Sequence, residues 1–427
     1  MRQRFRAGAR ATLRSLEVRN FRLFFGGQLI SQIGNWLTLV AQALFVLHLT
    51  DNNGIAVGVL TACQFLPVLV LGAWAGLVAD RADKRKLLLI VQSVAMLQSF
   101  ALATLVFLGD PPLVAVYALA MFGGVATAFD NPARRAFVVE MVPETHVQNA
   151  VSLNSALMTG SRIFGPALAG LLIVTVGYGW CFALDGVSYL AVLYGLWRMN
   201  TAELRPSAPA QQAKGQVRAG LRYARSVPEL WVPLMMMAII GTFAFNFPVV
   251  VPLFTKTVLH GTDSTFTLLF SVISVGSLVG ALYTARRTTT SVRDVVIGAG
   301  TFGVSMLVLA AAPNLASAFT ISVFVGFTSI LFMTASTAIV QMRAAPEMRG
   351  RVLALQAIVF LGSTPIGGPI LGAVCDAFGA RTGLALGAIA SLVAALYGTL
   401  AMRSSERDPE GRPSSLADAS GPTAVSV

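Results

Sequence analysis

Long apolar stretches without a charged residue recur along the whole chain, separated by short segments that hold most of the charges. A helix needs about 20 residues to cross a bilayer core about 30 Å thick. Stretches of about that length or longer therefore each predict one membrane-spanning helix. They are residues 23–50, 52–79, 87–109, 111–129, 230–255, 264–285, 352–375 and 382–402.

Two further segments are too long for a single crossing. The uncharged segment 295–342 is interrupted by the helix-breaking pair Pro313-Asn314, which divides it into two helices. The segment 145–197 contains Arg162 and the turn-like sequence 177–179, and it also divides into two. The pattern therefore predicts an all-α membrane protein with twelve transmembrane helices.

An internal repeat relates the two halves of the chain. Pro143-Glu144 precedes Gly165-Pro166 by the same spacing at which Pro346-Glu347 precedes Gly368-Pro369. Weak internal symmetry of this kind is typical of transporter folds, and an even number of helices per repeat makes the two repeats parallel. In this register Asn154, Arg162 and Asp185 of the first half align with Ala357, Pro365 and Ala388. Asp80 corresponds to Thr284, one position off the register, in the same way as Gly76 corresponds to Gly280. The scaffold is duplicated, whereas the candidate chemistry is confined to the first half.

The predicted organisation has five parts. They are a basic cytoplasmic arm (1–22), an N-terminal six-helix bundle (23–198), a cytoplasmic linker (199–229), a C-terminal six-helix bundle (230–402) and a disordered cytoplasmic tail (403–427). Residues 217–226 of the linker predict a short amphipathic helix, because Arg218, Arg222 and Arg225 recur at helical spacing.

Charge placement gives the orientation. The chain has 31 Lys and Arg against 19 Asp and Glu, a net charge of +12. Nearly all of the cations fall in segments that share one side if the N terminus is cytoplasmic, which is the positive-inside pattern rather than a nucleic-acid surface. We therefore expect a multi-pass protein of the bacterial cytoplasmic membrane, with both termini in the cytoplasm and membrane lipids as neighbours.

Several kinds of catalytic chemistry lack their usual sequence signals. Cys63, Cys181 and Cys375 stand alone in apolar surroundings, without the spacing of a disulfide framework or a zinc site. The chain has no phosphate-binding loop, no nucleophile elbow and no metal-ligand cluster. We expect neither an enzyme nor a bound cofactor or metal.

The loop after the second predicted helix carries a dense polar motif. It reads Gly76-Leu-Val-Ala-Asp80-Arg81-Ala-Asp83-Lys84-Arg85-Lys86 and resembles the loop 2-3 motif of the major facilitator superfamily, with Asp83 in place of the second glycine. The resemblance implies that Asp80, next to Gly76 and Arg81, latches the two halves in the outward-facing state. Its expected partners are Arg134 or Arg135 and the helix that begins near Gly350. The alternative is that Asp80 only caps its helix.

Motifs on helices 4 to 6 narrow the resemblance. The segment 131–135 (Asn-Pro-Ala-Arg-Arg), Asn154-Ser155, Arg162 and Phe182-x-x-Asp185 are similar to the bacterial branch that contains siderophore exporters and macrolide efflux pumps. Gly165-Pro166 with Gly170 resembles the antiporter motif of the superfamily, in which helices 5 and 8 pack tightly. The resemblance implies export, and the recurrence at Gly368-Pro369 indicates a shared packing device.

Arg162 lies about twelve residues into the fifth predicted helix, near the bilayer midplane. A cation facing lipid there would cost about 2.5 to 3.5 kcal/mol, so it is expected to face a cavity or a carboxylate. Asn154 shares its helical stripe, and the candidate partners are Asp185 and Asp130. Asp130 could instead pair with Arg134 one turn later. The pair is either structural or a site where a released carboxylate binds the coupling proton.

Neutral polar residues mark two further helices. Gln28, Gln32, Asn35 and Gln42 fall close to one stripe of helix 1 and predict either a cavity lining or bonds to other helices. On helix 7, Asn246 lies among phenylalanines that either form an adaptable wall for a bulky ligand or face lipid.

Together these features predict a secondary transporter that works as a monomer by alternating access. The predicted activity is proton-coupled efflux of amphipathic small molecules, such as macrolides or a siderophore. The alternatives are a lysolipid or nutrient carrier of the same fold and a membrane sensor or scaffold that does not transport.

Overall fold

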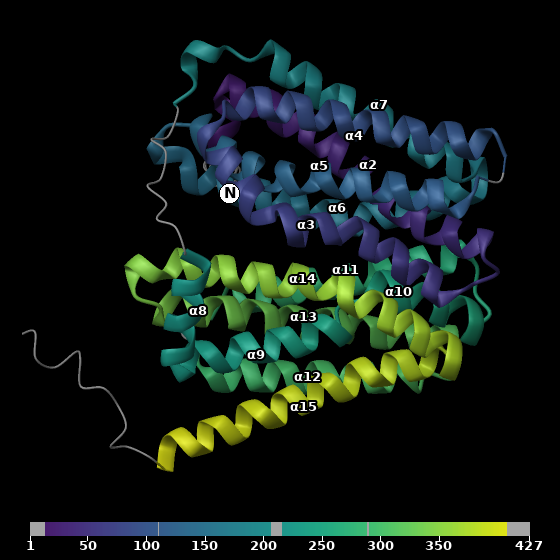
Figure 1. The fold of residues 1–427 in the computed structure, drawn as a ribbon, viewed down its shortest axis with the longest axis vertical. Coiled ribbons are helices and arrows are strands. Elements are labelled where there is room, and N and C mark those ends of the chain that lie inside the picture. Colours follow the sequence, from purple (N-terminus) through teal and green to yellow (C-terminus); the bar gives the residue numbers. More distant parts are fainter. Residues whose placement is uncertain (1–12, 110, 206–215, 288–289, 408–427) are drawn as a thin grey trace, which may run out of the picture.

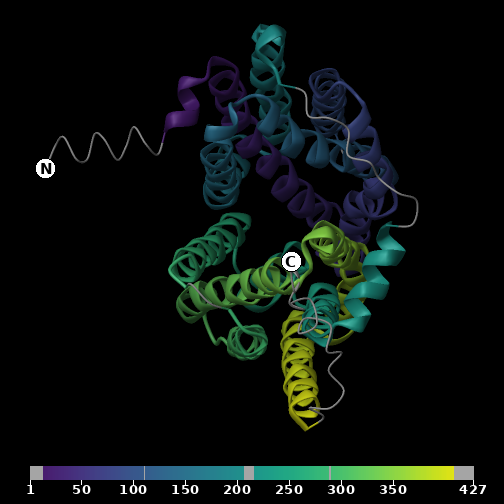
Figure 2. The ribbon, with the colours of Figure 1, turned by 90° about the vertical axis from the view of Figure 1, so that its left-hand side faces the viewer.

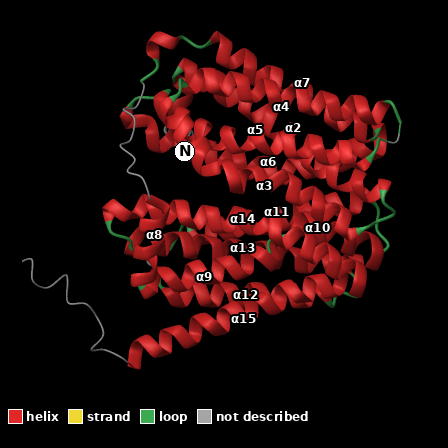
Figure 3. Cartoon of the chain, viewed as in Figure 1, coloured by secondary structure: helices red, strands yellow, loops and turns green. Residues whose placement is uncertain are grey.

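The computed structural model describes residues 13–109, 111–205, 216–287 and 290–407. Residues 1–12 of the predicted arm and nearly all of the predicted tail, 408–427, lie outside the described part. Within it every regular element is helical, as Figure 3 shows.

Twelve segments of the described chain are long and apolar enough to span a membrane, which confirms the predicted number. The first six are α2 (Arg19–Leu49), α3 (Gly54–Arg81), α4 (Lys84–Phe107), α5 (Leu113–Glu140), α6 (Val147–Val176) and α7 (Tyr178–Arg198). The second six are α9 (Pro228–Phe243) with α10 (Phe247–Leu253), α11 (Asp263–Thr284), α12 (Val292–Ala310), α13 (Leu315–Arg343), α14 (Pro346–Phe378) and α15 (Ala380–Arg407).

The helices form two bundles that follow the repeat, α2–α7 and α9–α15 (Figure 1). Equivalent helices pair in the same way, since α3 packs on α5 in one bundle and α11 packs on α13 in the other. Between the bundles, the main contacts are those of α3 with α14 and α6 with α11. We call the end at which α2 begins the inner end and the opposite end the outer end.

The seventh span is discontinuous, although the sequence predicted one helix. α9 ends at Phe243, and α10 begins at Phe247 after a short break. Pro248 explains the break, because proline lacks an N–H and its ring clashes with the carbonyl four residues earlier. Asn246 fills the gap, and its side-chain amide donates to the carbonyl oxygens of Thr242 at 2.7 Å and Gly241 at 3.4 Å.

Helical segments also occur outside the predicted boundaries of the two bundles. α2 begins at Arg19, and a short 3-10 helix (Arg14–Glu17) precedes it inside the predicted arm. Ser15 is buried there, and its N–H donates to Asn149 Oδ1 at 2.9 Å. In the linker, α8 (Gln216–Ser226) covers the segment for which the sequence predicts a short helix.

Candidate functional site

Asp185 on α7 is a carboxylate buried among hydroxyl groups. It is 1% exposed. Its Oδ2 accepts hydrogen bonds from Thr38 Oγ1 of α2 at 2.6 Å and Ser99 Oγ of α4 at 2.8 Å. Ser188 Oγ lies 3.4 Å from Oδ1, and a Cβ at Gly34 would lie 2.6 Å from the same oxygen. Three helices therefore close around this carboxyl group, and no ion pair joins it to a cation within the described chain.

A second carboxylate, Asp130 on α5, is held differently. Arg134 Nη2 lies 2.7 Å from Asp130 Oδ2, and Gln92 donates to Oδ1 at 2.6 Å. Arg134 is 5% exposed and also donates to Asn131 Oδ1 at 3.1 Å and to Gln28 Oε1 at 3.3 Å. Of the pairings that the sequence left open for Asp130, the structure contains the one with Arg134.

Arg162 does not meet either predicted carboxylate, because Asp185 is bonded to hydroxyl groups and Asp130 to Arg134. Its side chain is exposed and lies over the indole of Trp36, with its guanidinium carbon 5.9 Å from the ring centroid. Trp36 in turn packs against Phe270 of α11, with centroids 5.9 Å apart. Arg162 therefore faces the junction of the two bundles, and Asn154 on its stripe is half-buried.

Three of the four polar residues on the helix 1 stripe are held by side-chain hydrogen bonds in this conformation, and two of them, Gln28 and Gln42, bond to a neighbouring helix. Gln28, Gln32 and Gln42 are buried. Gln28 accepts from Gln32 and Arg134, and Gln42 accepts from Gln64 of α3 at 2.8 Å. Asn35 is exposed. The side chains of the stripe therefore mainly form hydrogen bonds within the bundle. Asn246 is also buried, in the break between α9 and α10.

The loop between α3 and α4 contains an ion pair that the sequence analysis missed. Lys84 Nζ lies 2.8 Å from Glu140 Oε1 at the end of α5, and both side chains are largely buried. Asp83 caps α4 by accepting from the Lys86 N–H at 3.1 Å. A cation at the start of a helix opposes the helix dipole, so Lys84 itself was a signal of a nearby carboxylate.

The predicted latch residues lie at the inner end of the N-terminal bundle. Arg134, one of the two expected partners of Asp80, is bonded to Asp130. Arg81 and Arg135 are exposed, while Asp80 is half-buried.

The outer ends of the two bundles are in tight contact through α3 and α14. A Cβ at Gly58 would lie 2.6 Å from the Gly368 carbonyl oxygen, and one at Gly54 would lie 2.7 Å from that of Gly372. Asp376 of α14 accepts hydrogen bonds from the backbone N–H groups of Gly54 at 2.6 Å and Ile55 at 2.9 Å. The carboxylate thus binds the positive end of the α3 dipole across the bundle interface.

The inner ends of the same helices are apart. Gly72 and Gly76 lie five turns after Gly54 and Gly58 and therefore on the same face of α3. A Cβ at either position would meet no atom within 4 Å, and the same holds for Gly350 near the start of α14. The two bundles are therefore closed at the outer end and separated at the inner end, as the ribbons in Figure 1 also indicate.

The predicted packing motif lies where the bundles touch. On α6, a Cβ at Gly165 would overlap Trp36, and one at Gly170 would overlap the Thr267 hydroxyl of α11. Pro166 is buried beside them. In the second repeat, Gly368 and Pro369 approach Gly58 of α3. The expected close packing of the fifth and eighth spans is therefore present, and the repeat has its equivalent. A further link at the outer end is the hydrogen bond from the Tyr178 hydroxyl of α7 to Asp263 of α11.

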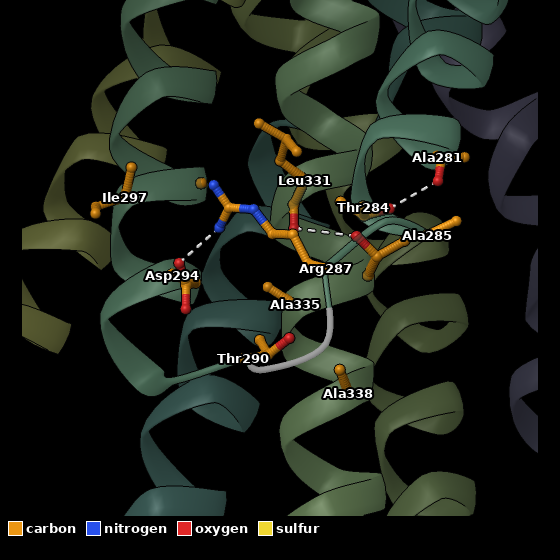
Figure 4. A pocket seen from close by; sticks show the side chains of 12 residues that line it. Ala281, Thr284, Ala285, Arg287, Thr290, Asp294, Ile297, Leu331, Ala335 and Ala338 are labelled. Carbon is orange, nitrogen blue, oxygen red and sulfur yellow. Dashed lines mark hydrogen bonds and ion pairs between the residues drawn. The ribbon is translucent and has the colours of Figure 1, made fainter.

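The inner end of the second bundle holds a cavity of about 310 Å³ at the position equivalent to the Asp80 loop (Figure 4). Thr284, which aligns with Asp80, donates to the Ala281 carbonyl oxygen at 2.9 Å. Arg287 pairs with Asp294 at 2.8 Å. All of the residues that line this cavity belong to the C-terminal bundle, so the cavity is not a passage between the two halves.

Comparison with known proteins identifies this arrangement. Residues 10–419 match the family described as transmembrane secretion effector. The chain belongs to this family of major facilitator transporters. Its relatives include the staphyloferrin A transporter of Staphylococcus aureus, which is 23% identical over 83% of this chain and 89% of that protein. Macrolide efflux protein A of Streptococcus pyogenes is 23% identical over 81% of this chain and 87% of that protein.

Solved structures of this superfamily have the same fold. A bacterial homologue of the human lysosomal transporter Spinster, in an inward-facing and unoccupied conformation, superposes with a TM-score of 0.71 at 14% identity. The superposition covers 91% of this chain and 98% of that one. The resemblance inferred from the loop and helix motifs is confirmed: this chain is a multi-pass membrane transporter and not an enzyme.

Proposed function

We propose that this transporter exports amphipathic small molecules from the cytoplasm in exchange for protons. The observation that carries the proposal is the environment of Asp185. An ionised carboxylate removed from water without a cation is strongly disfavoured, and binding a proton removes its charge. Thr38, Ser99 and Ser188 can orient the carboxyl group in either state, because a hydroxyl group both donates and accepts.

The same site has a mechanical connection to the bundle interface. Thr38 bonds to Asp185, and Trp36 two residues earlier on α2 contacts both Arg162 of α6 and Phe270 of α11. A change in the hydrogen bond at Thr38 would therefore act on the segment of α2 that touches the other bundle. This connection lets proton binding bias the equilibrium between the two open states, as coupling requires.

The relatives support export as the direction of transport, and the conformation indicates where a substrate would enter. With the positive-inside orientation, the separated inner end faces the cytoplasm and both termini lie there. A substrate would enter between α3 and α14, near the exposed Arg162 and Asn35, and leave after the outer contact opens. Relatives named for macrolide efflux support export of bulky amphipathic molecules. Asp80 would engage α14 when the inner ends close, and the chain would act as a monomer.

The test uses purified protein in liposomes with an imposed pH gradient. Wild-type protein should move a macrolide, a siderophore or a lipophilic cation against its gradient, and Asp185→Asn should abolish proton-driven movement. Asn at this position keeps the shape and removes the titratable group. The matched control is Asp51→Asn, which neutralises an exposed outer-loop carboxylate and should leave transport unchanged.

Three outcomes would contradict the proposal. Undiminished proton-driven transport by Asp185→Asn would exclude Asp185 as the proton site. Movement of lysolipid without any of the three export substrates would support a lipid carrier. A protein that moves none of these, yet keeps its cellular phenotype in the Asp185→Asn variant, would be a sensor or scaffold.

A further inference from the structure

The linker helix α8 lies across the bundle axes at the inner end of the C-terminal bundle (Figure 1). Seen from the inner end, it runs along the rim of the molecule beside α14 and α9 (Figure 2). Its contact face is made of small residues: Gly220 and Ala224 are buried, and a Cβ at Gly220 would lie 3.2 Å from Arg351 Cβ. The Ala345 N–H donates to the Tyr223 hydroxyl oxygen at 3.0 Å.

The opposite face of α8 is basic. Arg218, Arg222 and Arg225 follow at spacings of four and three, so they share one stripe, about half a turn away from Gly220 and Ala224. All three arginines are exposed. No ion pair involves them among the described residues, and the nearby Glu229 pairs with Arg343 at 3.3 Å. The stripe therefore carries three exposed positive charges without a carboxylate partner in the described part of the chain.

Trp231 indicates the depth of this face in the membrane. The guanidinium carbon of Arg225 lies 5.1 Å from the Trp231 ring centroid. Tryptophan is enriched at the level of the lipid headgroups, where its ring meets apolar chains and its N–H meets water. A helix at that depth, parallel to the membrane plane and outside the bundle, points its outer face at headgroups.

We propose that the stripe Arg218–Arg222–Arg225 binds anionic phospholipid headgroups of the inner leaflet. Guanidinium groups bind phosphate through paired hydrogen bonds, and juxtamembrane cations are attracted by an anionic leaflet. Because α8 is bonded to the segment that begins α14, the bound lipid holds the inner end of the C-terminal bundle at the headgroup layer. The site is separate from Asp185 and does not depend on the transported substrate.

The experiment compares lipid retention in nanodiscs that contain equal amounts of phosphatidylglycerol and phosphatidylcholine. Native mass spectrometry of the released wild-type protein should find phosphatidylglycerol strongly preferred. The variant R218Q/R222Q/R225Q should lower that preference at least tenfold, since each arginine contributes on the order of fivefold. The variant R218K/R222K/R225K should keep most of this preference, because it retains the positive charge of the stripe on a folded α8.

A control removes the same number of exposed charges elsewhere at the inner end, in R198Q/R286Q/R293Q. The preference should fall by less than twofold there. An equal fall in both glutamine triples would mean that only general inner-end charge matters, and an unchanged preference in R218Q/R222Q/R225Q would mean that the stripe binds no lipid. Either result overturns the proposal.

Discussion

The two bundles share their backbone plan but differ in what they bury. In the described residues, the buried charged side chains are Lys84, Arg134, Glu140 and Asp185, all of them in the N-terminal bundle. The C-terminal bundle buries hydroxyl and amide groups and a cluster of rings, in which Phe245 packs within 5.2 to 6.0 Å of Phe247, Phe302 and Phe360.

The contrast is sharpest at one pair of equivalent positions. Asp185 of α7 aligns with Ala388 of α15, which is fully buried. Where α4 and α7 leave room for a carboxyl group and its hydroxyl partners, α12 and α15 close together. A Cβ at Gly303 would lie 2.9 Å from the Ala388 carbonyl oxygen. Both copies therefore have closely packed small residues, whereas the buried charges of the described residues lie in one copy.

The most damaging way to erase this difference is to give the second bundle a carboxyl group. Ala388→Asp should lower the free energy of unfolding by more than about 4 kcal/mol, because the site has neither space nor partners for a charge. Denaturant unfolding in detergent micelles measures it, with Ala388→Ser as the milder control. A fully stable Ala388→Asp protein would show that the second bundle accepts the same chemistry.

Removing a charge from the first bundle should be nearly as harmful. Arg134→Ala leaves the Asp130 carboxylate without its cation, and breaking a buried pair in this way costs about 3 to 5 kcal/mol. The double variant D130N/R134Q should recover much of the loss. The control is Thr337→Ala at the equivalent position of α13, where the hydroxyl only bonds to the Met333 carbonyl. Equal destabilisation by Arg134→Ala and Thr337→Ala would contradict the proposed difference between the two bundles.

The loops after α3 and α11 offer a smaller test. Lys84→Met should destabilise the protein by about 2 kcal/mol, because the ion pair with Glu140 is shielded from water and its loss leaves less positive charge beside that carboxylate. Arg287→Met should have no measurable effect, since the pair with Asp294 is open to solvent. Thermal unfolding of both variants compares the two loops directly. The reverse order of effects would be unexpected.

The smallest expected effect concerns hydrogen bonds between uncharged side chains in the second bundle. Gln356 Nε2 donates to Ser336 Oγ at 2.9 Å, and both residues are buried. A double-mutant cycle with Gln356→Leu and Ser336→Ala should give a coupling of about 0.6 kcal/mol, the average for hydrogen bonds between membrane helices. A coupling as large as that of Asp130 with Arg134 would remove the distinction between the bundles.

The fold was predictable because membrane crossing leaves a strong pattern. Apolar length alone predicted twelve spans, and the repeated Gly-Pro pairs predicted the parallel repeat. The break at Asn246 was not predicted from hydropathy, since both halves of the seventh span are apolar. Nor does a proline by itself indicate a break, because Pro67 lies inside the continuous helix α3.

The candidate site was predictable in its charges but not in their partners. Asp130 with Arg134 follows from helical spacing within one helix. The partners of Asp185 on other helices do not, because they are hydroxyl groups of α2 and α4. Most membrane serines and threonines bond to the carbonyl four residues earlier, as Ser271 does, so sequence does not distinguish Thr38 or Ser99 from them. The position of Arg162 on Trp36 likewise depends on how α2 and α6 cross.

The residues that form the contact at Asp376 differ in how well they tolerate mutation. Its two donors are main-chain amides, which every amino acid except proline supplies, so most changes at Ile55 leave them in place. Gly54 must remain small, because a Cβ there would lie 2.8 Å from Asp376 Oδ1. Mutation can therefore break this particular contact mainly at two positions, one that supplies a charge on α14 and one that must lack a side chain on α3.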